Sequence, residues 1–312
     1  MAAPLKWKTK VLLFKIEGAY GVDAAPTGLA DAVLAQDVQI KPMEGSDVSR
    51  DLETPYFAAD ATIPTELQSE LTFDVELVPS GTAGTAPAWG PILRACGLAE
   101  TITAGTSVVY NPITDEPESA TTYLYIDSTL YALTGARGTV KLDIQAQAIP
   151  KLKFTFKGLF VRPAEAVRPA ATLDSWVKPQ LATHANTPTF TIDAMPLVMR
   201  SFMLDLANQI EGRFLIGKEA IEITDRAEAI ETTVEALKLT SFDPFEMALN
   251  QAGVPIQLVH GTGAGMITTL DIPKAQMQRP QGLSNAQNVK EWPLRLVPLP
   301  TAGNDQFTLT LT

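Results

Sequence analysis

The residues best suited to chemistry in this sequence are two histidines and one cysteine. His184 and His260 are the only histidines among 312 residues and lie far apart, and Cys96 is the only cysteine. A metal site or a hydroxyl–imidazole pair needs several such groups in one place. No histidine or CxxC partner is near Cys96 to lower its pKa, so we expect it to be a small buried hydrophobic residue and not a nucleophile.

Two glycine-rich stretches have the composition of phosphate-binding loops. HGTGAG at 260–265 is not followed by Lys-Ser/Thr and does not open a helix, so it predicts a turn. SGTAG at 80–84 predicts a flexible connection between a strand and a helix. The acidic pair Asp115 and Glu116 falls in a proline-rich loop. We therefore expect no enzyme activity, no cofactor and no bound metal.

Composition limits the class of protein further. The 24 basic and 35 acidic residues give a net charge of −11, which argues against a surface that binds nucleic acid tightly. A single cysteine excludes a disulfide framework and fits a reducing compartment. The apolar patch VLLF at 11–14 is too short for a signal peptide or a membrane span. We expect a protein that is made and kept in a cytosol, without contact with a membrane.

Strict alternation of apolar and polar residues predicts β-strands along most of the chain. LTFDVELV (71–78), VKLDIQA (140–146) and LKFTFKG (152–158) each place apolar side chains on one face. Such strands have one face in a core and the other in water. Asp74 and Glu76 lie on the wet face of the first strand.

The second half of the chain contains a comparable strand, ETTVEALKL at 231–239. Its wet face has Glu231, Thr233 and Glu235. Between the halves, four prolines interrupt residues 162–188, which predicts an extended linker. The expected domains are therefore 1–161 and 189–312.

Residues 41–66 form a long polar segment between two strand candidates. The segment is too long for a hairpin turn, and loops of this length are usually functional or disordered. Tyr56 and Phe57 are its expected anchors, because exposed aromatic side chains gain most when a partner buries them. Asp47, Arg50 and Asp60 are the charged contact candidates beside them.

Two short helices interrupt the strands. In APAWGPILRACGLAE (86–100), Trp89, Leu93 and Cys96 share one helical face and Gly97 ends the helix. In DPFEMALNQAG (243–253), Phe245 and Leu249 share the equivalent face, with Asp243 as N-cap, Pro244 in the first turn and Gly253 as the stop. We expect each apolar face to pack on a sheet.

The two helices are related by a constant offset. Phe245 and Trp89, Leu249 and Leu93, and Gly253 and Gly97 are each 156 positions apart. Each half also ends in two strands in which apolar and polar residues alternate. Residues 292–296 are therefore expected to correspond to 140–144, and residues 307–311 to 154–156. The pattern predicts a mainly β fold, built as a tandem duplication of one β-sandwich domain that is flanked by one short helix.

Whole segments of the first half resemble the major tail tube proteins of long-tailed bacteriophages. These are GAYGVDAAPTGLADAVLAQDVQIKP (18–42), LTFDVELVPSGTAGTAPAWGPILRACGLAE (71–100) and YALTGARGTVKLDI (131–144). The resemblance implies a sandwich that assembles into stacked rings around a DNA-wide channel, with the segment at 41–66 reaching the adjacent ring. It implies no catalytic residue. The implied location is the virion tail, assembled in the bacterial cytoplasm.

Open strand edges can pair with other chains and cause aggregation. Edges that pair with neighbouring copies in a defined way would instead direct assembly. The polar strand faces would then line the channel, and Asp74, Glu76, Glu231, Thr233 and Glu235 are the lumenal candidates. Carboxylates there would repel phosphate, so DNA could pass without binding. The implied partners are other copies, the tape-measure protein, the tail terminator and distal tail proteins, and passing duplex DNA. The alternative for these acids is a face in bulk solvent.

Two domains per chain predict three chains per ring, with approximate sixfold symmetry. The alternative is a hexamer of whole chains, in which the second domain decorates the outside. A two-domain decoration or receptor-binding module of the virion, or a secretion-system tube of the same fold, also fits the residues.

Overall fold

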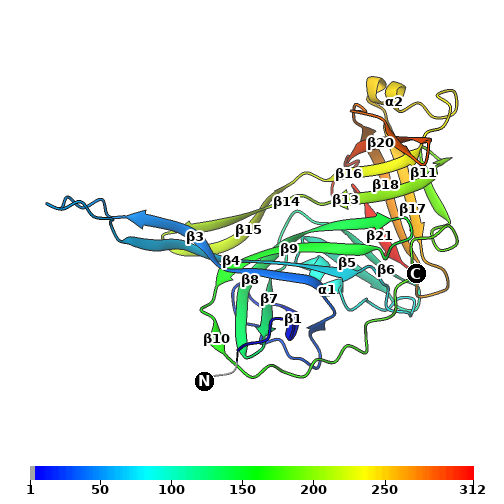
Figure 1. Ribbon diagram of the computed structural model, residues 1–312. Helices are drawn as coiled ribbons and strands as arrows, with labels where there is room; N and C mark the ends of the chain where they lie inside the picture. Colours follow the sequence, from blue (N-terminus) through cyan, green and yellow to red (C-terminus); the bar gives the residue numbers. More distant parts are fainter. Residues whose placement is uncertain (1–3) are drawn as a thin grey trace.

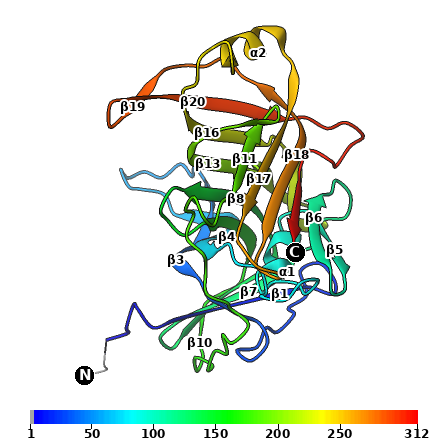
Figure 2. The same ribbon diagram turned by 90° about the vertical axis from the view of Figure 1, so that its right-hand side faces the viewer.

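The computed structural model describes residues 4–312 and is mainly β, as the sequence predicts. One long sheet runs through both halves of the chain, and Figure 2 shows its strands following one another from β20 down to β3. In spatial order it contains β3 (Gln36–Ser49), β4 (Thr62–Glu76), β9 (Lys151–Phe160), β8 (Thr129–Gln145), β13 (Met199–Asp205), β16 (Ala229–Glu235), β20 (Val289–Pro298) and β19 (Ser284–Ala286).

Two further groups of strands pack against the long sheet or continue from it. The first comprises β2 (Ala32–Val33), β1 (Lys10–Ile16), β7 (Ala120–Ile126), the beginning of β8 and β10 (Ala164–Glu165). The second comprises β5 (Leu98–Thr103), β6 (Ser107–Pro112), β21 (Thr308–Leu311), β18 (Thr268–Met277), β17 (Gly253–His260), β11 (Thr189–Ile192) and β12 (Met195–Pro196).

The two halves share one core. The buried cluster includes Leu93 and Val140 from the first half and Leu204, Leu206 and Phe307 from the second. Among residues 4–312, strand pairing joins the halves twice, through β8 with β13 and through β6 with β21. The proline-rich stretch 162–188 contains only the two-residue β10.

The polar segment 41–66 is not a loop. Most of it belongs to β3 and β4, which form a long hairpin, and only residues 50–61 connect them. Figure 1 shows this hairpin projecting from the body of the molecule. A projecting hairpin has no core on either face, so it lacks the apolar alternation by which a strand is recognised. Residues 42–68 are called arm 1 below.

A second hairpin occupies the corresponding place in the second half. β14 (Asn208–Leu215) and β15 (Lys218–Arg226) pair with each other between β13 and β16. Residues 208–226 are called arm 2. Figure 1 shows arm 2 lying alongside the first half, whereas arm 1 extends further out.

The strand order corrects the expected alignment of the two halves. β4 pairs with β9, and β16 pairs with β20. The strand with residues 292–296 therefore takes the place of residues 152–156, not of 140–144. Residues 307–311 do not match 154–156 either, since β21 pairs with β18 and β6 and lies outside the row of strands from β3 to β19.

Helix α1 (Gly90–Arg94) lies in the core. Trp89, Leu93 and Cys96 are almost completely buried, and the indole Nε1 of Trp89 donates a hydrogen bond to the Val78 carbonyl at 2.7 Å. Gly97 has φ +75°, the left-handed conformation expected where a helix ends.

Helix α2 (Pro244–Asn250) contradicts the expected packing. Asp243 caps it as predicted, but Phe245 is 39% exposed and Leu249 81% exposed. Phe242 is buried in their place, with its ring 5.9 Å from that of Trp292. The left-handed residue that ends the helix is Gln251, because Gly253 already begins β17. In Figure 1 this helix lies at the outer end of the second half, beyond the sheets.

Candidate functional site

The most extended polar feature of the fold is one face of the long sheet. Directly opposed residues of antiparallel strands share a face, so the pairing registers trace rows across it. One row crosses six strands as Glu76, Lys151, Asp143, Met203, Glu231 and Arg295. The residues between them along each strand, such as Val75, Leu152 and Ile144, are buried on the opposite face.

Ion pairs link neighbouring strands across this polar face. Lys153 Nζ lies 2.6 Å from Asp143 Oδ2, and this bond raises the pKa of Lys153. Lys141 Nζ lies 2.8 Å from Asp205 Oδ2, which joins the two halves of the chain. These contacts stabilise the sheet and neutralise much of its charge.

Charges of both signs lie on this face. Glu70, Lys157 and Arg137 extend it along β4, β9 and β8. In the rows that run from the first half into the second, seven carboxylates accompany five cations. The carboxylates are those of Asp74, Glu76, Asp143, Asp205, Glu231, Glu235 and Glu291, and the cations are those of Lys141, Lys151, Lys153, Arg200 and Arg295.

The five lumenal candidates lie on this one face, in two groups. Asp74 and Glu76 are on β4, and Glu231, Thr233 and Glu235 are on β16. Four strand spacings separate β4 from β16, which is about 19 Å.

Several of the acids are paired. Asp74 lies 3.5 Å from Lys151, Glu76 accepts a hydrogen bond from Gln36 at 2.9 Å, and Glu231 pairs with Arg295. The lumenal candidates predicted from the sequence include no cations. Lys141 and Lys153 could have been predicted, since the alternation of apolar and polar residues places both on the wet face of a strand.

The long sheet ends in two edges. Within residues 4–312, β3 pairs only with β4, and β19 pairs only with β20. The junction between the halves shows how such edges can join, because residues 141–145 of β8 pair with residues 201–205 of β13.

The contact candidates of the polar segment all lie on arm 1. Asp47 is in β3, and Arg50, Tyr56, Phe57 and Asp60 are in the connection at its tip. All five are exposed, and Phe57 is 112% exposed.

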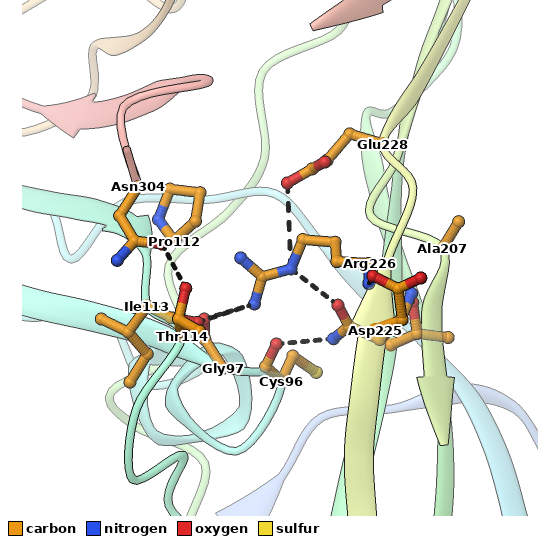
Figure 3. Close-up of polar contacts among 12 residues, drawn as sticks. Cys96, Gly97, Pro112, Ile113, Thr114, Ala207, Asp225, Arg226, Glu228 and Asn304 are labelled. Atoms are coloured by element: carbon orange, nitrogen blue, oxygen red, sulfur yellow. Dashed lines mark hydrogen bonds and ion pairs between the residues drawn. The ribbon is translucent and has the colours of Figure 1, made fainter. Parts of the chain in front are cut away.

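A buried polar cluster, shown in Figure 3, attaches arm 2 to the end of α1. Arg226 donates to the carbonyls of Gly97 at 2.9 Å and Ile113 at 3.2 Å, and its Nε donates to Asn208 at 2.8 Å. Glu228 lies 3.8 Å from Arg226 Nε. Burial lowers the pKa of Arg226 and raises that of Glu228, because each charge is partly removed from water.

The amide of Asn208 completes the cluster. It donates to the carbonyls of Cys96 at 2.7 Å and Gly138 at 2.9 Å. Cys96 is enclosed beside it, and burial raises the pKa of its thiol well above the ordinary value. The thiol is therefore protonated, which favours the expected packing role over a nucleophilic one.

The two glycine-rich stretches pack on each other. Gly81 N donates to the Gly265 carbonyl at 3.0 Å, and a Cβ on Gly265 would lie 2.5 Å from Gly81. Gly81, Gly261 and Gly265 also have positive φ. Close backbone approach explains these glycines.

The histidines lie apart in the fold. His260 is buried, with its Nδ1 3.0 Å from the hydroxyl of Thr187, and His184 lies in the stretch 162–188. Among residues 4–312, no group of three histidine, cysteine, aspartate or glutamate side chains could hold a metal ion. Neither helix in that range is long and apolar enough to cross a membrane.

The fold and the polar face of the long sheet define a β-rich protein with a broad charged sheet surface and open strand edges. This arrangement is typical of structural assembly proteins. The family model described as phage tail tube protein matches residues 7–296. The chain therefore belongs to the phage tail tube protein family, which is a family of structural proteins of the virion tail and not of enzymes. No curated protein matches the chain.

Proposed function

We propose that three chains close a ring of the tail tube, in which each chain contributes its repeated halves, 1–161 and 189–312, to approximate sixfold symmetry. The junction between β8 and β13 is the observation that supports this ring, because it joins one half to the other edge to edge. The junction between chains repeats it, with β3 of one chain against β19 of the next.

The sheet dimensions agree with a channel for DNA. Eight strands per chain give 24 strands in three chains. With strands about 4.8 Å apart and tilted by about 40°, the barrel would be roughly 48 Å across at the backbone. Side chains on the inner face reduce this to roughly 40 Å, which admits a DNA duplex.

A hexamer of whole chains fits the fold less well. In that arrangement the first halves alone form the tube. The end of β8 must then pair with a strand from the first half of another chain. Residues 141–145 of β8 are already paired with β13 of the same chain. The occupied edge favours three chains per ring.

The polar face of the long sheet is the proposed lumenal face. Its cations are paired with carboxylates, so few are free to displace the counterions of DNA. Duplex DNA would pass during genome delivery without specific binding. The tape-measure protein would occupy the same space earlier, and terminator and distal tail proteins would meet the ends of the tube, which is assembled in the host cytoplasm.

Imaging of the purified protein at high concentration tests the ring. We expect closed rings or tubes with three chains per ring by native mass spectrometry and by averaged end-on views. Six chains per ring would refute the trimer. Chains that stay monomeric at every concentration would favour the decoration or receptor-binding module.

A variant of the channel tests the lumenal face. Replacing Asp74, Glu76, Glu231 and Glu235 with Lys should leave assembled tubes that release DNA more slowly, and the delay should be greater at low salt. Ejection at the wild-type rate at every salt concentration would assign these residues to the outer surface.

A further inference from the structure

The outer edge of the long sheet is interrupted in the second half. Two strands pair with the outer side of β20: the end of β18 opposes it as far as Met277, and β19 opposes it from Ser284 onward. Residues 278–283 connect these strands and belong to neither, and they are called the edge loop below. Figure 2 shows β19 and β20 at the end of the row of strands. The edge that faces the next chain in the proposed ring is therefore not continuous.

The pairing registers give the size of the interruption. Met277 opposes Leu296, and Ser284 opposes Glu291. Four residues of β20 lie between these two pairs, whereas the edge loop has six. Extra residues on one strand leave the ladder and form a bulge. The edge loop is thus a bulge with two residues more than a regular strand would have.

The first half has a regular strand in the corresponding place. Because β20 takes the place of β9, the end of β18 and β19 together take the place of residues 138–143 of β8. Those residues pair with β9 without a register shift. Residues 141–145 of β8 form the junction with β13 on their other side. The edge loop therefore replaces the segment that, in the first half, joins one half to the next.

Two prolines explain why regular pairing stops here. Gln278 N donates to the Arg295 carbonyl at 2.8 Å, so Arg295 directs its backbone groups toward the outer edge. Alternate residues of an antiparallel strand face the same neighbour, so residue 293 faces the edge loop as well. Pro293 has no N–H and removes the next hydrogen bond of the ladder, and Pro280 removes a donor from the loop itself.

The edge loop lies over the polar face and is held by few contacts. Arg279 and Gln281 line a cavity of about 470 Å³ together with Asp143 and Glu231 of the polar face. A Cβ on Gly282 would meet no atom within 4 Å. Within residues 4–312, no backbone hydrogen bond joins residues 279–283 to another segment. Segments with few buried contacts and few backbone hydrogen bonds open at low cost in free energy.

We propose that the edge loop controls when a ring closes. Over the polar face, it prevents another strand from pairing along the outer edge of the second half. Ring closure moves it into the plane of the sheet, where it pairs with β3 of the next chain. Bulges, prolines and short strands are the features by which open edges avoid pairing with other chains.

The length of β19 supports the need for this movement. β19 has three residues, whereas the junction of β8 with β13 has five residue pairs. An edge of comparable length requires the edge loop to join β18 and β19 into one strand. The inference rests on the proposed ring and names the step that regulates its closure.

Hydrogen exchange of the wild-type protein tests the movement. The amides of residues 279 and 281–283 should exchange rapidly in monomers and slowly in rings, because they enter a ladder only in the ring. Residues 141–145 are the control, since they are paired with β13 in the monomer and should be protected in both states. Rapid exchange of the edge loop in closed rings would overturn this inference alone. Wild-type chains that never assemble would overturn the ring and the inference with it.

Variants of loop length provide a second readout. Deletion of Gln281 and Gly282 together with Pro293→Val gives the edge the length and the donor of a regular strand. A binding-competent state that is populated at about 10% or less weakens apparent affinity about tenfold or more, so this variant should assemble at about one-tenth of the wild-type concentration or below. Irregular aggregates at such concentrations would also support the inference, because an unprotected edge pairs with any strand.

Insertion of two glycines after Gly282 is the matched control. It changes the same loop in the opposite direction and should not assemble more readily than the wild type. Assembly of the shortened variant only at the wild-type concentration would overturn the inference, and so would easier assembly of both variants. If the shortened chain does not fold, hydrogen exchange of the wild-type protein decides.

Discussion

Replacement of Arg226 by Met should destabilise the junction between the two halves more than loss of an exposed ion pair would. The variant keeps most of the side-chain volume but removes the donors to Gly97, Ile113 and Asn208. It also leaves Glu228 buried without its cation. Breaking a buried pair by removing one partner costs about 3–5 kcal/mol, so the free energy of unfolding should fall by that amount.

Arg94→Met is the matched control. Arg94 also bonds a carboxylate, that of Glu118, at 2.6 Å, but both side chains are about one-third exposed. Exposed pairs contribute about 0.2–1 kcal/mol. The double variant Arg226→Met/Glu228→Gln should recover part of the loss, because it removes the uncompensated charge.

Denaturant unfolding of the monomer at neutral pH measures these differences. The loss in Arg226→Met should shrink as the pH is lowered, because burial raises the pKa of Glu228 and protonation then removes its charge. A cost below about 1 kcal/mol, equal to that of Arg94→Met, would refute the argument that this cluster holds the halves together.

The remaining predictions concern the core, α2 and pH. Trp89→Ala should cost about 3–5 kcal/mol in monomer unfolding, whereas Trp89→Phe should lose about 1–2 kcal/mol for the hydrogen bond to Val78; equal costs would contradict the burial of the ring. Leu249→Ala should change monomer stability by less than about 0.5 kcal/mol, and a loss of several kcal/mol would mean that α2 packs inside. Burial lowers the pKa of His260 below its ordinary 6.5, so the unfolded state takes up the proton first and the free energy of unfolding should fall as pH drops through 6.5. Unfolding at pH 7.5 and 5.5 should show a smaller fall in His260→Asn, and an equal fall in both proteins would exclude this histidine as the cause.

The sequence by itself determined the class of fold and much of the first half. Alternation at 71–78, 140–146 and 152–158 placed the correct side chains in the core, because a strand buried on one face has a period of two. Trp89 and Cys96 were assigned to a buried helix face for the same kind of reason. Asp243 was recognisable as an N-cap, since capping depends on local backbone geometry.

Tertiary structure alone decided which strands are neighbours and which apolar faces are covered. The spacing of Phe245 and Leu249 equals that of Trp89 and Leu93, yet only the first helix has strands and an arm around it. Periodicity reports that a face is apolar and not that a partner exists within the chain. Arm 1 escaped detection because a hairpin outside the core needs no alternation. The polar face of the long sheet is formed by strands from distant segments, and the pairing registers decide which side chains lie on it together. No local sequence pattern specifies these registers.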